Sequence, residues 1–390
     1  MKPLKLILII LFIAQIACAQ KSNGFTNIDI KALLIPENLT HNTKDIADWV
    51  NTNFQSETDK SRAIFIWVAR YLEYDVDNMF AINFNEQAND RIEKVLKTRK
   101  GICEDYAVLF NDICTKAGIK SYLVEGYTKQ NGFADYLPHA WCAAKIDTSW
   151  YLFDPTWGSG YVSKGKFYSR INNDYFKAQP AAFIKSHIPF DPLWEFLNYP
   201  VTNKEFYDGK FQEDKSKPFF DYNDSIEKFN HQTELEQWIS AALRIESNGM
   251  KNSMIFSYYE NMKRNIEITK QNEIIARQNE EVHKYNASLD DYNIGITALN
   301  DFIQYRNKQF NPMKSDYDIQ AMIDSAGVRL ISARSKLDNI SDPPENIKSS
   351  VTRLSKSIDD GIKQKNEFQD FLNKYFSKGK FGRKQMFYTK

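Results

Sequence analysis

A seven-residue repeat of apolar residues in the last third of the chain most constrains the fold. The repeat runs through Ile268, Ile275, Val282, Leu289, Ile296, Ile303 and Phe310. Because a heptad spacing brings such residues to one face of an α-helix, the segment predicts one long helix whose apolar seam other helices must cover. Asn311-Pro312 is expected to end this helix.

Two more heptad series follow and supply the covering helices. They are carried by Ile319, Ala326, Ala333 and Ile340 and by Ile347, Val351, Leu354 and Ile358, with Pro343-Pro344 between them. Short turns between such helices favour an antiparallel three-helix coiled coil over residues 258–376. We expect a helical connector at 222–257 and a basic tail at 377–390. The coiled coil is predicted to bind proteins or to self-associate rather than to catalyse.

The first residues carry the pattern of an export signal. Lys2 and Lys5 precede an apolar run at 6–13, which is too short to span a bilayer, and Ala17-Cys18-Ala19 resembles a cleavage site. We predict a signal peptide at 1–19, a secreted or periplasmic protein and no transmembrane helix. Lipid anchoring at Cys18 is a less favoured alternative, because Gln15 stands where lipoprotein signals usually carry an aliphatic residue.

The composition is that of a folded protein that does not bind nucleic acid. Of the 390 residues, 42% are hydrophobic and 14% aromatic, which is ample for packed cores. Lys and Arg total 51 against 50 acidic residues, and the basic residues are dispersed rather than gathered in a stripe. At about 150 residues per domain, the length predicts at least two structural units.

Residues 20–221 have the pattern of an α+β domain. Apolar residues at helical spacing predict helices over 42–54, 56–71, 91–98 and 104–117. Aromatic and β-branched runs predict strands over 121–128, 140–146 and 150–153. The expected architecture is therefore a set of helices followed by an antiparallel sheet.

Three residues of this domain form the pattern of a cysteine acyl-transfer enzyme. They lie in the segments GICEDYAVLFNDIC, PHAWCAAKI and WYLFDPTWGSGYV. Cys103 begins a predicted helix, where the helix dipole favours a thiolate and free N–H groups could hold an oxyanion. His139, just before a strand, could act as the base, and Asp154, at the end of the next strand, could orient it. Each residue alone is usually structural, but their joint order favours catalysis.

The hairpin between the last two strands decides whether His139 and Asp154 can meet. A two-residue loop at Asp147-Thr148 places Trp141 opposite Asp154, so His139 lies on the adjacent diagonal of the same face. A three-residue loop without a bulge would put the two side chains on opposite faces.

The other cysteines and the acidic residues near Cys103 receive no catalytic role. Cys114 lies about three helical turns later and is expected to be buried, and a disulfide between Cys114 and Cys142 stays open. Glu104 and Asp105 are expected only to complement the helix dipole. The cysteines lack the spacing of a metal site and no calcium-type carboxylate cluster is evident, so we predict no metal or cofactor.

Together these motifs resemble the transglutaminase-like superfamily, in the branch that includes kyphoscoliosis peptidase and the cytokinesis transglutaminase-like proteins. The segments AIFIWVARYLEYDVD and DYFKAQPAAFIKSHIPFDPLWEFLNYPVTNKEF extend the resemblance over residues 56–206. It implies a papain-like α+β core, with a nucleophilic cysteine on a helix packed against a sheet that bears His and Asp. It assigns these roles to Cys103, His139 and Asp154.

Two classes of function follow. The first is an exported thiol enzyme that forms a thioester from a peptide or glutaminyl amide, which water resolves in a protease or amidase and an amine resolves in a cross-linking enzyme. Hydrolysis is favoured because water is always available and nothing marks an amine site. The second is an inactive adaptor that binds envelope or surface proteins through its fold and coiled coil. The reactivity of Cys103 distinguishes the two.

Overall fold

The computed structural model describes residues 24–80, 86–130 and 132–388. The predicted signal peptide, with Cys18, lies outside the described residues. Contacts divide the chain into two compact units, residues 1–266 and 267–390, and each is described by itself. None of the described helices is long and apolar enough to cross a membrane.

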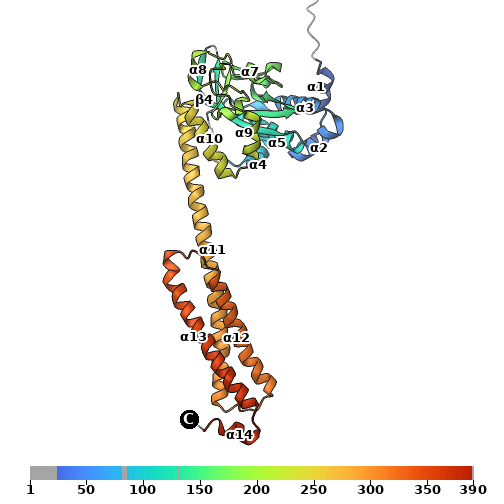
Figure 1. Cartoon of the computed structure of the whole chain (residues 1–390). Coiled ribbons are helices and arrows are strands. Elements are labelled where there is room, and N and C mark those ends of the chain that lie inside the picture. Colours follow the sequence, from blue (N-terminus) through green and yellow to red (C-terminus); the bar gives the residue numbers. More distant parts are fainter. Residues whose placement is uncertain (1–23, 81–85, 131, 389–390) are drawn as a thin grey trace, which may run out of the picture. The chain divides into compact units, whose positions relative to one another are not determined.

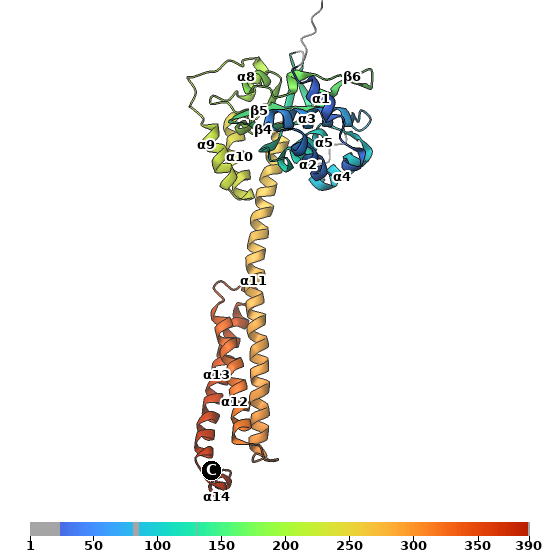
Figure 2. The ribbon, with the colours of Figure 1, turned by 90° about the vertical axis from the view of Figure 1, so that its right-hand side faces the viewer.

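The first unit begins with helices that build one half of its core. They are α1 (Thr26–Ala32), the 3-10 helix η1 (Glu37–Leu39), α2 (Thr43–Asn53), α3 (Glu57–Tyr71), α4 (Ala88–Thr98) and α5 (Cys103–Lys116). Polar N-caps start two of them, because Asn42 accepts from the Asp45 N–H and Ser56 from the Asp59 N–H. The helices α2, α3 and α5 lie side by side (Figures 1 and 2). The four predicted helices of this region are confirmed.

A four-stranded antiparallel sheet forms the other half of the core. Its order is β5-β4-β3-β8, with β3 (Ser121–Gln130), β4 (Phe133–Ile146), β5 (Ser149–Phe153) and β8 (His187–Pro189). Ile146 pairs with Ser149 around the two-residue loop Asp147-Thr148, so the predicted hairpin register is confirmed. The expected start of the second strand is wrong, because β4 begins at Phe133 and His139 lies inside it.

The two faces of this sheet pack against different layers. Residues of one parity, such as Cys142 and Phe153, enter the core that Phe110 of α5 also joins. Residues of the other parity, such as Trp141 and Trp150, enter a second core. Cys103 lies at the first position of α5, a helix that packs on β3 and β4.

Further helices and strands complete the first unit. They are β1 (Glu73–Tyr74), β2 (Lys100–Gly101), α6 (Pro155–Ser159), β6 (Gly160–Ser163), β7 (Lys166–Ser169), η2 (Asn173–Tyr175), α7 (Pro180–Phe183), η3 (Pro192–Glu195), α8 (Asn203–Asp208), α9 (Tyr222–His231) and α10 (Glu234–Asn248). The strands β1 and β2 pair in parallel, and β6 pairs with β7. The long helix α11 (Ser253–Asn307) starts in this unit and runs on without a break.

The second unit is all-α. After α11 it holds α12 (Asp316–Asp338), α13 (Glu345–Phe376) and the short α14 (Lys380–Gln385). Leu299 of α11, Ile323 of α12 and Leu372 of α13 share one buried cluster. The predicted fold class, an α+β core followed by an all-α antiparallel helical region, is confirmed.

The heptad seam of α11 differs from its prediction in detail. Ile268 and Ile275 are 54% and 50% exposed, so the predicted burial of these two positions is wrong. Farther along, the buried residues form a column one position earlier than the predicted one, at Glu281, Ser288, Gly295 and Phe302. The second heptad series is confirmed for its members Ile319, Ala326 and Ala333, all of which are buried.

Candidate active site

Cys103 occupies the first position of α5, and its setting is built by the residues around it. Asp105 accepts a hydrogen bond from the Ile102 N–H at 2.7 Å, which closes the first turn of the helix. A Cβ on Gly101 would lie 2.5 Å from the Asp105 Cβ, so only glycine permits this turn. Arg91 of α4 bonds the same carboxylate at 2.9 Å. Asp105 thus holds the helix start, a role beyond the expected complement to the dipole.

His139 and Asp154 meet across the β4–β5 hairpin, as the register prediction requires. His139 Nε2 lies 2.8 Å from Asp154 Oδ2. The Asp154 side chain is fully buried and that of His139 is 9% exposed. With Nε2 engaged by the carboxylate, Nδ1 is the ring nitrogen left to face a thiol.

The other carboxylate oxygen of Asp154 explains why this residue precedes a proline. Asp154 is the N-cap of α6, and its Oδ1 accepts from the N–H groups of Thr156 at 2.8 Å and Trp157 at 3.1 Å. Pro155 takes the first helical position, where a missing N–H is harmless. Because Oδ1 is used in capping, the side chain is fixed and Oδ2 points at the imidazole.

His187 is a site residue that sequence reasoning missed. It begins β8, is fully buried, and its Nε2 lies 3.1 Å from the same Asp154 Oδ2. Its Nδ1 lies 2.8 Å from the Ser186 hydroxyl, and Phe183 stacks on its ring at 4.1 Å. Asp154 therefore serves two imidazoles, one on β4 and one on β8.

The site's electrostatics follow from this shared carboxylate. Burial disfavours its charge, but the two imidazoles outweigh burial and hold the pKa of Asp154 well below its usual range. Burial also opposes protonation of His139, yet Asp154, aided by a hydrogen bond with Cys103, raises the pKa of His139 above its usual range. At His187 burial prevails and lowers the pKa to about 4, so this ring is neutral near pH 7.

His139, Asp154 and His187 also have a spacing that could hold a metal ion. Their ligand atoms lie within 4.8 Å of one another. Two imidazoles and one carboxylate are a donor set that suits zinc. Both Nε2 atoms are within hydrogen-bonding distance of Oδ2, which accounts for the cluster without an ion.

Two hollows flank the Cys103–His139 pair. A cleft of about 590 Å³ is lined by His139, Trp157 and Tyr74 among others. A separate small space of about 20 Å³ is lined by Cys103, Glu104, His139 and neighbouring residues. The nucleophile candidate and its base candidate thus border one enclosed space with access to solvent beside it.

Cys114 and Cys142 are both fully buried thiols, and the described cysteines form no disulfide. The Cys142 thiol donates to the Ala107 carbonyl at 3.1 Å. Burial raises the pKa of both thiols well above the usual range. These properties fit the packing role predicted for Cys114.

Comparison with known proteins identifies the domain that holds this geometry. A model of the transglutaminase-like superfamily matches residues 43–155. Kyphoscoliosis peptidase of Mus musculus is 34% identical over 164 residues, which cover 40% of this chain and 24% of that protein. LIM and transglutaminase domain protein ltd-1 of Caenorhabditis elegans is 24% identical over 255 residues, or 60% of this chain and 34% of that protein. The chain thus spans a quarter to a third of these relatives.

A solved structure adds a similarity at low coverage. The periplasmic domain of TgpA from Pseudomonas aeruginosa is 19% identical, with a TM-score of 0.25, over 33% of this chain and 46% of that chain. The family match itself contains Cys103, His139 and Asp154. Residues 43–155 thus match the transglutaminase-like superfamily, and the kyphoscoliosis peptidase relative supports this assignment.

Proposed function

We propose that this protein is an exported thiol enzyme that cleaves or transfers peptide or glutaminyl acyl groups through a thioester on Cys103. The observation that carries the proposal is the 2.8 Å contact of His139 Nε2 with Asp154, beside a space that His139 and Cys103 line together. This is the arrangement that nucleophile, base and orienting carboxylate need in cysteine acyl transfer.

The proposed reaction has two halves. His139 takes the thiol proton through Nδ1, and the Cys103 thiolate attacks the amide carbonyl. The C–N bond then breaks, and His139 returns its proton to the leaving amine. In the second half His139 deprotonates water or an amine, which attacks the thioester and releases Cys103 as the leaving group.

Three features at and around the triad support this cycle. The N–H of Cys103, at the first helical position, is not used inside α5 and is free to stabilise the oxyanion. Asp154 keeps the imidazole in one orientation and stabilises its protonated form. His187, as a neutral second donor, fixes Asp154 from the opposite side. We propose His187 as a positioning residue.

Hydrolysis is the favoured outcome. Water is present in any open cleft, and one relative carries the name kyphoscoliosis peptidase. An inactive adaptor that binds proteins through its fold and its helical region is the second candidate. It is favoured by the exposed apolar residues Ile268 and Ile275 on α11, which a partner would cover.

The reactivity of the three thiols separates enzyme from adaptor. Purified protein is treated with iodoacetamide near pH 7 and mapped by mass spectrometry. The enzyme hypothesis expects alkylation of Cys103 long before the fully buried Cys114 and Cys142, which serve as internal controls. Equal, slow labelling of all three thiols would contradict it.

Turnover then decides between the two acyl acceptors. Casein cleavage is compared with incorporation of a labelled amine into casein, using Cys103→Ala as the inactive control and Cys114→Ala as the matched control. Cleavage lost only in Cys103→Ala indicates hydrolysis, and amine incorporation lost in the same way indicates transfer. Activity that survives Cys103→Ala would rule out this nucleophile.

Export is a separate part of the proposal and has its own test. Cleavage after Ala19 predicts a mature chain that begins at Gln20 and is found in the periplasm or medium. N-terminal mass analysis of the native protein checks this. A retained Met1 would contradict export by this signal, and a diacylglyceryl group on Cys18 would establish lipid anchoring instead.

A further inference from the structure

A third hollow, much larger than the small space at Cys103, adjoins that space. It measures about 410 Å³, more than ten times the roughly 30 Å³ of a water molecule. Glu125, Pro138 and Phe190 line both hollows and therefore form the neck between them. A group that reaches into the larger cavity through this neck passes directly beside the proposed nucleophile.

The far wall of this cavity comes from α10 and the first turns of α11. The apolar side chains of this wall suit the methylene stem of a long side chain. They are Trp238, Met254, Tyr258 and Met262. Two contacts connect this wall to the segment that follows β8. Tyr258 stacks on Phe190 with ring centroids 4.5 Å apart, and Arg244 of α10 bonds Asp191 at 2.7 Å.

The neck is acidic. Glu125 of β3 is paired in the sheet with Ala140, next to His139, and its carboxyl group hydrogen-bonds the Tyr258 hydroxyl. Glu104 also lines the small space at Cys103. Two carboxyl groups thus border the passage from the thiol to the cavity.

The cation that contacts Glu104 is already shared among several carboxylates. Arg91 lies 3.0 Å from Glu104, 2.9 Å from Asp105 and 3.5 Å from Glu86. Burial raises the pKa of Glu104 to about 7 and raises that of Glu125 too, although Arg91 acts in the opposite direction on both. A further cation at the neck would stabilise the ionised form of these carboxyl groups.

We propose that this cavity binds a lysine or arginine side chain of the peptide substrate, with its stem passing Pro138 and Phe190 at the neck and its cationic end at the Glu125 carboxyl group, beside Tyr258 of the far wall. The proposal rests on the function proposed above and names the substrate feature that the site selects. A purely apolar side chain would fill the same walls but leave the Glu125 carboxyl group desolvated and uncompensated. The cation therefore provides the specificity.

Two alkylating probes of equal shape test the pocket without any need for turnover. N-(5-aminopentyl)chloroacetamide carries an ammonium group where N-hexylchloroacetamide carries a methyl group. Both react with a thiolate by displacement of chloride. We expect the folded protein to be alkylated at Cys103 about tenfold faster by the cationic probe. In protein unfolded by guanidinium, which gives the intrinsic ratio, we expect no such preference.

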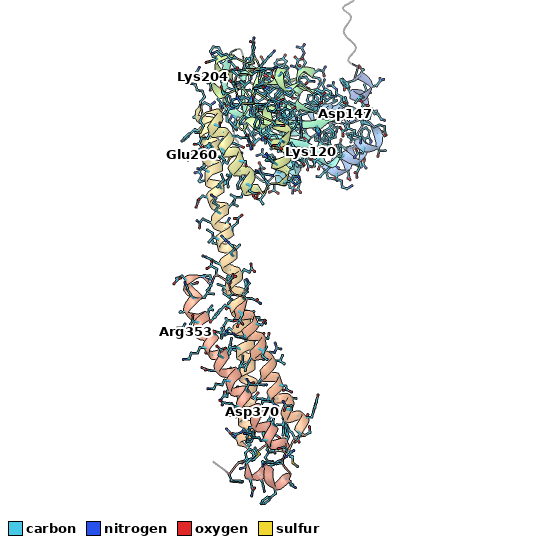
Figure 3. All side chains as sticks on the ribbon, in the orientation of Figure 1. Lys120, Asp147, Lys204, Glu260, Arg353 and Asp370 are labelled. Carbon is cyan, nitrogen blue, oxygen red and sulfur yellow. The ribbon has the colours of Figure 1, made fainter. Side chains whose placement is uncertain are left out.

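Variants that lack one carboxyl group show which residue causes the preference for the cationic probe. Glu125→Gln should reduce the rate ratio of the two probes towards one. Glu260→Gln removes the same charge from an exposed position of α11 outside the cavity and should leave the ratio unchanged (Figure 3). A wild-type ratio near one, or a tenfold ratio that survives Glu125→Gln, would overturn the proposed pocket while leaving the thiol chemistry intact.

A binding measurement keeps the two proposals separable. In Cys103→Ala, calorimetry compares pentylammonium with 1-pentanol, which have the same stem. The pocket is supported if Cys103→Ala binds pentylammonium more strongly than 1-pentanol and if this difference disappears in the double variant Cys103→Ala, Glu125→Gln. This result supports the pocket even if wild-type Cys103 proves unreactive. Equal binding of the two compounds rejects the pocket, whatever the thiol does. Slow alkylation of Cys103 by both probes would count against the enzyme proposal alone.

Discussion

The two units each bury an aspartate, and the difference lies in what surrounds it. Asp154 in the first unit is 0% exposed and Asp291 in the second is 4% exposed. Asp291 joins Arg329 at 3.0 Å, Ser332 at 2.6 Å and Lys336 at 2.6 Å, and these contacts lower its pKa to about 2. Its cationic partners are permanently charged and nearly half exposed, so solvent screens them.

At Asp154 the partners are two buried imidazoles and two backbone N–H groups. An imidazole can accept and donate a proton during a reaction, so this network can exchange a proton, whereas the network of Asp291 can only hold α11 against α12. A buried carboxylate is therefore no sign of an active site by itself. Partners that can change their protonation state are what distinguish the first unit.

Removal of the two aspartates should have different effects, on activity in the first unit and on stability in the second. Asp154→Ala deprives His139 of its orienting carboxylate, and we expect thiol-dependent turnover to fall by about 10²–10⁴-fold. Asp291→Ala should leave turnover unchanged and reduce the free energy of unfolding by about 1 kcal/mol, given the screening of its partners. Both are measured as activity per folded protein and by thermal melting. Equal activity losses would refute the distinction.

The helical unit should be sensitive to packing instead. Leu330 is fully buried on α12, close to Gly295 and Gly361. We expect Leu330→Ala to destabilise residues 267–390 by about 3 kcal/mol through the cavity it leaves. Hydrogen exchange of this unit measures the loss, and Val328→Ala, at an exposed position of the same helix, is the control. The alkylation rate of Cys103 should not change. A large fall in that rate would show that the units are energetically coupled.

Local patterns were enough to predict the first unit's helices and the meeting of His139 with Asp154. The reason is that a two-residue loop fixes register, and register fixes which side chains share a face. His187 was not predictable in this way, because it reaches Asp154 through a strand 33 residues later. Its one local signal is a polar ring in the apolar run His187-Ile188-Pro189-Phe190, where a buried histidine needs a partner.

The helical unit shows a different limit. Heptad spacing predicted the three helices, but the most buried column of α11 includes Ser288 and Gly295 instead of the neighbouring Leu289 and Ile296. A Cβ on Gly295 would come within 3.0 Å of Leu330, and the Ser288 hydroxyl donates to the Ala333 carbonyl at 2.7 Å. Close approach of helices selects small residues, which a pattern of hydrophobicity alone places on the surface.

His187 offers a finer test of what the second imidazole contributes. Because its ring is neutral, it donates one hydrogen bond to the charged Asp154, a contact worth about 1.5–3 kcal/mol. We expect His187→Phe, which keeps a ring beside Phe183, to lower turnover by about 10–100-fold. His187→Gln retains an N–H donor and should recover part of the loss. If His187 only packs, activity per folded protein should be equal in both variants, and so should the pH profile of Cys103 alkylation.

The acidic neck at Cys103 should leave a pH signature that the helical unit lacks. Burial raises the pKa of Glu104 from 4.5 to about 7, so between these values the folded protein holds a proton that the unfolded chain has released. Stability must then fall as pH rises from 5 to 8, by on the order of 2 kcal/mol from this group. Glu104→Gln, which cannot ionise, should gain that amount relative to wild type over the same range, as measured by urea unfolding. Glu260→Gln is the exposed control. A constant difference between Glu104→Gln and wild type would mean that Glu104 is ionised throughout, and the neck would then need no further cation.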